Sequence, residues 1–232
     1  MRARISGARL RSMWRFSAGN YVALTVSGLP VFVLPILVAN TLGTAEAALW
    51  FMAALISGLL TSIPQATTQS FYAELTAHPE STREQLIKVL RVTVMYDAVG
   101  LAGLLALGWP ALALFGGSYT DAYPTLALLS VAGAVASIGY VGRTLLLASG
   151  RLRVLTAYST VFCVLVLACT ALALSHGIVA AGVAWLVGES LASLPYVNLI
   201  RVALREGSLP SEGPRSSVTD SELSPLIGGT HA

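Results

Sequence analysis

Residues 16–45, FSAGNYVALTVSGLPVFVLPILVANTLGTA, contain no Lys, Arg, Asp, Glu or His. Their apolar part, residues 22–39, is interrupted by Pro30 and Pro35. A helix crosses a bilayer core about 30 Å thick with roughly 20 apolar residues, because each residue adds about 1.5 Å. These residues therefore predict a transmembrane helix. The rest of the chain repeats the unit: a charge-poor run alternates with a short charged or turn-rich break.

The composition places the whole chain in the membrane class. Hydrophobic residues make up 55% of the 232 residues and charged residues 11%, and the mean hydropathy is +0.74. Soluble domains carry about 25% charged residues, so lipid must solvate much of this surface. The net charge of +3 does not indicate nucleic-acid binding, because the positive charges lie in the breaks between charge-poor runs and form no single patch.

Six runs of spanning length predict an all-α polytopic membrane protein with six transmembrane helices in one bundle. We expect Gly108-Trp109-Pro110 to end the third helix. The tail is rich in Ser, Pro, Gly and Glu, which is typical of disorder. We therefore predict three parts of the chain: a basic cytoplasmic N-terminus (1–15), a transmembrane bundle (16–205) and a disordered cytoplasmic tail (206–232). The predicted spans are residues 21–40, 47–69, 89–107, 124–148, 154–174 and 178–200.

The positive charges predict the orientation, because cytoplasmic loops carry an excess of Lys and Arg. Residues 1–15, 70–91, 149–153 and 201 onward fall on one side of six spans. They hold all but one of the fourteen Lys and Arg residues, the exception being Arg143 near the inner end of the fourth span. The turns on the other side hold none. Both termini are therefore predicted to be cytoplasmic, in a multi-pass protein of the plasma (inner) membrane.

Three prolines lie inside the first two predicted helices: Pro30, Pro35 and Pro64. Proline is tolerated in spanning helices because neighbouring helices and Ser or Thr side chains satisfy the freed carbonyls. Two interpretations stay open. The prolines bend the helices around a cavity, or they serve simple packing, since proline is common in membrane helices.

Asp97 and Arg143 fall at matching depths in the third and fourth spans. Asp97 is nine residues past Lys88, about 13 Å deep, and Arg143 is eight residues before Arg151, about 12 Å deep. Each costs roughly 2.5–3.5 kcal/mol at a helix centre. We predict that they pair across the two helices. The alternative is that Arg143 extends to the inner interface.

Glu189 lies near the midplane of the sixth span, about 18 Å from Arg201. Two interpretations are open: it is neutral or hydrogen-bonded to Ser190 or Ser193, or it faces a water-filled cavity as a proton or cation site. Gln65 and Gln69 are weaker candidates for a translocation path, with interhelical hydrogen bonding as the alternative.

No pattern indicates an enzyme. The sequence holds no Gly-rich phosphate loop, no nucleophile with a matching base and no cluster with metal-ligand spacing. Cys163 and Cys169 are six residues apart in one apolar run, on different faces of a helix. We therefore predict no catalytic residue, no metal and no cofactor.

A series of short motifs resembles the polysaccharide and lipid-linked oligosaccharide flippases of the multidrug/oligosaccharidyl-lipid/polysaccharide exporter superfamily. Their order and spacing carry the resemblance, which covers residues 16–202. The motifs are Asn20-Tyr21, Leu29-Pro30, Leu34-Pro35, Leu42-Gly43, Ile63-Pro64, Phe71 to Glu74, Leu114-Phe115-Gly116, Tyr119, Ala122, Leu126 to Leu129, Gly150-Arg151, Gly177-Ile178, Ala181-Gly182 and Ala184.

The resemblance implies one lobe of a two-lobed flippase, the C-terminal one, since chains of this family hold about twice as many spans. It implies export of a polyprenyl-linked oligosaccharide for cell-surface polysaccharide biosynthesis by alternating access, with Arg143 as a contact for a pyrophosphate. The partners it implies are this lipid-linked oligosaccharide, membrane lipids, and a homodimer mate or a second half-transporter chain.

Two other functions remain open. One is a cation-coupled small-molecule (multidrug) exporter of the same superfamily, for which a midplane acid such as Glu189 would suit proton coupling. The other is a truncated or accessory half-transporter without transport activity of its own, which the length of six spans favours.

Overall fold

The computed structural model describes residues 7–209, with the backbone alone at residues 7–13, 15 and 16. Within this range the chain forms six long helices and no strand. Each is long and apolar enough to cross a membrane. The prediction of an all-α, multi-pass bundle is therefore confirmed. The elements are α1 (Gly7–Leu42), α2 (Thr44–Ala77), η1 (Pro79–Ser81), α3 (Thr82–Ala113), η2 (Gly117–Ala122), α4 (Tyr123–Ala148), α5 (Leu152–Ala173), η3 (Leu174–His176) and α6 (Ile178–Glu206).

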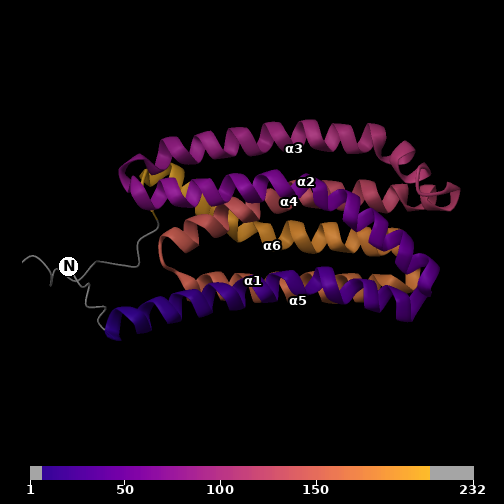
Figure 1. The fold of residues 1–232 in the computed structure, drawn as a ribbon, viewed down its shortest axis with the longest axis horizontal. Coiled ribbons are helices and arrows are strands. Elements are labelled where there is room, and N and C mark those ends of the chain that lie inside the picture. Colours follow the sequence, from indigo (N-terminus) through magenta and orange to yellow (C-terminus); the bar gives the residue numbers. More distant parts are fainter. Residues whose placement is uncertain (1–6, 210–232) are drawn as a thin grey trace, which may run out of the picture.

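Successive long helices run in opposite directions (Figure 1). α2 packs against α4, α4 against α6, α6 against α5, α5 against α1, and α1 against α2. Five helices therefore form a closed ring. α3 lies outside the ring against α2 and α4, along the upper edge of Figure 1.

The two ends of the bundle differ in charge. The α2–α3 and α4–α5 connections and the end of α6 share one end, which carries the basic breaks and which we call the basic end. The other three connections lie at the opposite end, which we call the turn end. There a single residue, Gly43, separates α1 from α2, and its φ of 94° is a conformation that glycine adopts without strain.

Helix α3 continues past the predicted end of the third span. The prediction that Gly108-Trp109-Pro110 ends this helix is wrong, because α3 runs on to Ala113. Pro110 removes only its own hydrogen bond, and continued helix satisfies the other backbone groups away from water. Gly108 is buried against α4, where an added Cβ would lie 2.8 Å from a methyl carbon of Leu126.

The outer segments of the chain extend the bundle. Helix α1 begins at Gly7, so helical backbone crosses the predicted boundary between residues 15 and 16. Helix α6 ends at Glu206, and Gly207 follows with a left-handed φ of 65°. Of the predicted disordered tail, residues 210–232 lie outside the described residues.

The prolines lie inside helices, as expected from their positions. Pro30 and Pro35 are within α1, and Pro64 is buried within α2. Each lacks the N–H that would bond the carbonyl four residues earlier. Figure 1 shows α2 changing direction partway along its length, and Pro64 is the one proline in that helix.

The buried core is continuous at the turn end and divided toward the basic end. At the turn end, α1 and α2 share one cluster that includes Leu34, Val38 and Trp50. Toward the basic end, α2 packs with α3, α4 and α6 around Leu75, whereas α1 packs with α4, α5 and α6 around Ala23. Helices α1 and α2 therefore belong to separate clusters there, with a cavity between them.

Candidate functional site

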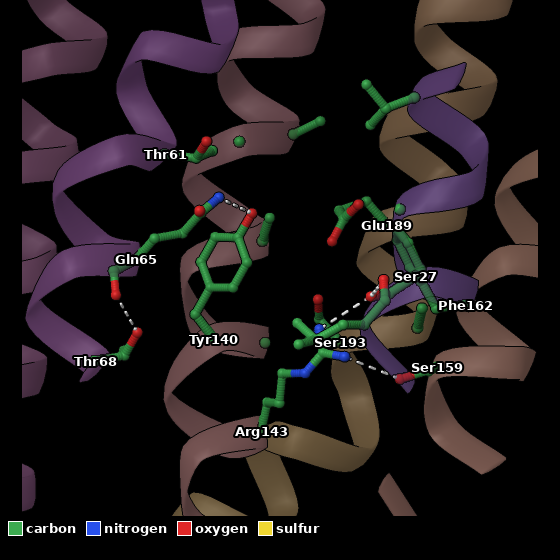
Figure 2. Close-up of a pocket in the computed structure, with 18 of the residues that line it drawn as sticks. Ser27, Thr61, Gln65, Thr68, Tyr140, Arg143, Ser159, Phe162, Glu189 and Ser193 are labelled. Atoms are coloured by element: carbon green, nitrogen blue, oxygen red, sulfur yellow. Dashed lines mark hydrogen bonds between the residues drawn. The ribbon is translucent and has the colours of Figure 1, made fainter. Parts of the chain in front are cut away.

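A cavity of about 770 Å³ lies inside the five-helix ring. Helices α1, α2, α4, α5 and α6 line it, and none of the described residues of α3 does. Four of the residues proposed from the sequence, Gln65, Gln69, Arg143 and Glu189, meet in its wall. The fifth, Asp97, lies elsewhere. Figure 2 shows the polar side chains converging on the cavity from several helices.

Arg143 projects from α4 into this cavity and is held by hydroxyl groups. Its Nη1 donates a hydrogen bond to Ser27 Oγ on α1 over 3.0 Å. Its Nη2 donates to Ser159 Oγ on α5 over 3.4 Å. No described carboxylate lies within ion-pair distance of the guanidinium. The positive charge therefore stays available to an anion that enters the cavity.

The predicted pair between Asp97 and Arg143 is wrong. Asp97 is buried on α3, at 8% exposure, and its Oδ1 accepts a hydrogen bond from Ser137 Oγ over 3.2 Å. Ser137 and Arg143 are six residues apart on α4, which places their side chains about 120° apart around the helix and about 9 Å apart along it. Asp97 therefore lies level with Ser137 rather than with Arg143, and Ser137 and Arg143 are on different faces of α4.

Glu189 projects from α6 into the cavity and is 7% exposed. Within the described residues its carboxylate has no hydrogen-bond or ion-pair partner. Of the two neighbours predicted to bond it, Ser190 instead donates to the carbonyl of Leu186 over 2.7 Å. Ser193 lines the same cavity. Figure 2 shows the Glu189 carboxylate pointing toward the open space between α6 and Tyr140.

The two glutamines lie on α2. Gln65 Nε2 donates a hydrogen bond to Tyr140 Oη on α4 over 3.0 Å, so Gln65 both lines the cavity and makes the interhelical bond that was the alternative. Gln69 lines the cavity and is exposed. Tyr140 was not identified from the sequence as a site residue, although it precedes Arg143 by three residues and so shares a helix face with it. No comparable spacing pointed to Ser27 or Ser159.

Two tryptophans cover the cavity toward the turn end. Trp50 of α2 and Trp185 of α6 lie with their ring centroids 6.2 Å apart and their planes at 53°. Trp50 is 1% exposed, and both residues line the cavity. The cavity is therefore closed on this side by an aromatic pair.

The cavity is open between α1 and α2. Leu24 and Val31 of α1 line it and are 51% and 58% exposed. Gly58 and Gln65 of α2 also line it and are exposed. The lining residues of α4, α5 and α6 are buried or half-buried. A ligand can therefore enter from the side of the bundle, between two apolar helices.

The arrangement suits an amphipathic anion, because a polar wall and a guanidinium lie behind an apolar entrance. The described residues hold no group of three or more His, Cys, Asp or Glu side chains that could bind a metal ion. Comparison with known proteins adds no relative: no family model, no curated protein and no solved structure matches this chain.

Proposed function

We propose that this chain is one lobe of a membrane transporter that moves a polyprenyl-linked oligosaccharide across the plasma (inner) membrane, by alternating access, for cell-surface polysaccharide biosynthesis. The observation that carries the proposal is the position of Arg143. Its guanidinium lies in a cavity that opens sideways between α1 and α2 and bonds only to the hydroxyls of Ser27 and Ser159 within the described residues.

Each part of such a substrate has a counterpart in the cavity. The polyprenyl chain would remain between the apolar edges of α1 and α2, beside Leu24 and Val31. The pyrophosphate would accept hydrogen bonds from Arg143, since guanidinium groups bind phosphates well. The sugars would meet the amides and hydroxyls of the wall, such as Gln65 and Tyr140.

The test is transbilayer movement of a fluorescent polyprenyl-pyrophosphate sugar in proteoliposomes that contain the full chain. A hydrogen bond to a charged group contributes about 1.5–3 kcal/mol, so Arg143→Ala should slow movement roughly 10- to 100-fold, with partial recovery in Arg143→Lys. Arg201→Ala is the control, because Arg201 is exposed at the basic end, away from the cavity. Wild-type movement in Arg143→Ala, or equal losses in both variants, would remove Arg143 from the path.

A cation-coupled small-molecule exporter is the second candidate, and the buried carboxylate of Glu189 favours it. An acidic side chain in the cavity without a partner among the described residues could take up a cation. In the same proteoliposomes, a pH gradient should then drive export of a cationic dye, and Glu189→Gln should abolish this drive. Dye movement that ignores both the gradient and the substitution would exclude this candidate.

A further inference from the structure

A second buried acid lies outside the cavity, on the helix that is not part of the ring. Asp97 of α3 is 8% exposed, and no described Lys, Arg or His lies within ion-pair distance of it. Among the described side chains, only Ser137 of α4 bonds to its carboxylate. A buried charge without a partner of opposite sign is costly. Asp97 therefore carries a negative charge that no described residue balances.

The Ser137 hydroxyl lies between two acceptors and can serve only one of them. Its Oγ is 3.2 Å from Asp97 Oδ1 and 3.3 Å from the carbonyl oxygen of Gly133. Hydrogen bonds donated by hydroxyls usually measure about 2.5–3.0 Å, and Ser130 on the same helix donates over 2.7 Å. Because a hydroxyl carries one proton, donation to Gly133 leaves an Oγ lone pair facing the carboxylate. Only a positively charged ligand can bridge two such acceptors.

Thr93 adds an unpartnered oxygen beside the same carboxylate. It precedes Asp97 by four residues, so the two side chains are neighbours on one face of α3. Thr93 is 4% exposed, and its Oγ1 has no hydrogen-bond partner within the described residues. Threonines in helices often bond the carbonyl three or four residues earlier, as Thr144 and Thr156 do here. Thr93 Oγ1 is instead free to bind a ligand.

A backbone carbonyl of α2 is free at the same level. Leu60 packs against both helices of the site: its methyl carbons would lie 2.5 Å from a Cβ added at Gly100 of α3 and 3.7 Å from one added at Gly133 of α4. Pro64 has no N–H to donate to the Leu60 carbonyl. Helical carbonyls point toward the C-terminal end of their helix, which for α2 is the basic end. Asp97 lies about 4.5 Å nearer that end than Gly100 does, so the Leu60 carbonyl points to its level.

We propose that a sodium ion binds beside Asp97, between α3 and the neighbouring helices α2 and α4. Its ligands are oxygen atoms only: the carboxylate of Asp97, the hydroxyls of Thr93 and Ser137, and the carbonyl of Leu60. Hard cations prefer such ligands, and one carboxylate balances one positive charge. Na⁺ binds oxygens at about 2.3–2.6 Å, as Ca²⁺ does, and two such ligands at right angles lie about 3.3–3.7 Å apart. The distances around Ser137 are close to this range.

The ion holds α3 on the ring, since α3 packs mainly on α2 and α4 and all three helices contribute ligands. None of the four ligand residues lines the cavity, so this site is separate from the proposed transport path and from Glu189. A proton on Asp97 is the alternative. One proton makes one hydrogen bond, whereas an ion contacts all of these oxygens, so the unpartnered oxygens favour the ion.

The first test is thermal unfolding of the full chain in detergent micelles, with NaCl replacing choline chloride at constant total salt and pH. The midpoint should rise with Na⁺ to a plateau, because an ion that binds only the folded chain stabilises it. Asp97→Asn should abolish this rise, whereas Glu189→Gln, which changes the buried acid of the cavity, should keep it. A wild-type midpoint that ignores Na⁺ or follows pH alone would overturn the proposal. So would a Na⁺ response that survives in Asp97→Asn or vanishes in Glu189→Gln.

The second test keeps the carboxylate and so does not depend on the folding of Asp97→Asn. Thr93→Val retains the shape of the side chain and removes Oγ1. It should raise the Na⁺ concentration for half-maximal stabilisation at least about tenfold, a change of roughly 1.4 kcal/mol. Thr160→Val on α5 is the control, because the Thr160 hydroxyl bonds only a carbonyl of its own helix, over 2.9 Å. An unchanged concentration in Thr93→Val, or equal rises in both variants, would overturn the proposal. Neither test measures transport, so ion binding and the proposed function can fail separately.

Discussion

Arg143 on α4 donates a hydrogen bond of 3.0 Å to Ser27 on α1, although the two helices are not neighbours in the ring. The bond therefore spans the cavity. Helix α1 otherwise packs on α5 along its length, on α2 near the turn end, and on α4 and α6 only around Ala23 toward the basic end. An anion that takes the guanidinium would compete with Ser27 for it, so ligand binding and the position of α1 are linked through one side chain.

Ser27→Ala should loosen α1 without unfolding the bundle. The bond to a charged donor contributes about 1.5–3 kcal/mol, and its loss should speed amide hydrogen exchange around Ser27, as measured by mass spectrometry in micelles. Thr160→Ala is the control, because the Thr160 hydroxyl bonds only a carbonyl of its own helix, over 2.9 Å. Equal amide exchange in wild type and Ser27→Ala would contradict the link between Arg143 and the position of α1.

Ser137→Ala should destabilise the protein and leave transport intact. The substitution removes the donor to the buried Asp97 carboxylate, which costs about 1–3 kcal/mol in the free energy of unfolding. Denaturant unfolding in micelles measures it. Ser130→Ala, on the same helix, is the control, since its buried hydroxyl bonds only the carbonyl of Leu126. An equal loss in Ser130→Ala would show that the contact with Asp97 is not what stabilises the fold.

Much of the fold was predictable from sequence because the bilayer restricts it. Long charge-poor runs predicted the six helices, as residues 16–45 illustrate. The continuation of α3 past Gly108 was missed, because a Gly-Trp-Pro series ends helices in water but not where neighbours and lipid favour continued helix. Positive charges in the breaks gave the predicted orientation.

The site was only partly predictable, because spacing from the charged breaks gives only a rough depth along a helix and no facing direction. Spacing predicted one depth for Asp97 and Arg143, yet Asp97 contacts Ser137, six residues from Arg143 on α4, and Arg143 lies in the cavity. Glu189 and Gln65 were found as rare polar residues in apolar runs. Ser27 and Ser159 were missed, since serine is common in membrane helices and only tertiary contact gives these two a role.

Gly142→Ala should destabilise the contact between α4 and α6, whereas Gly139→Ala should not. A Cβ at Gly142 would lie 2.6 Å from Tyr196 Cβ, but a Cβ at Gly139 would lie 3.9 Å from the Tyr196 ring, an ordinary contact. Overpacking costs about 1–3 kcal/mol, while alanine in place of glycine favours a helix by about 1 kcal/mol. Thermal unfolding in micelles should separate the two variants, and equal midpoints would refute the close approach of α6.

Trp185→Ala should open the cavity toward the turn end. The ring centroids of Trp50 and Trp185 lie 6.2 Å apart, and the two rings cover that side of the cavity. An aromatic pair contributes about 0.5–1.5 kcal/mol of stability beyond its buried area. Loss of this aromatic pair should raise the population of molecules whose cavity is open toward the turn end roughly 2- to 10-fold.

The reporter is Ala136→Cys in the cavity wall, labelled by an impermeant maleimide from the turn-end side, with Cys163 and Cys169 replaced. Trp109→Ala is the control, because Trp109 is exposed and lies outside the cavity. If both tryptophan variants label alike, the aromatic pair does not close the cavity; faster labelling in Trp185→Ala alone assigns that closure to the contact between α2 and α6.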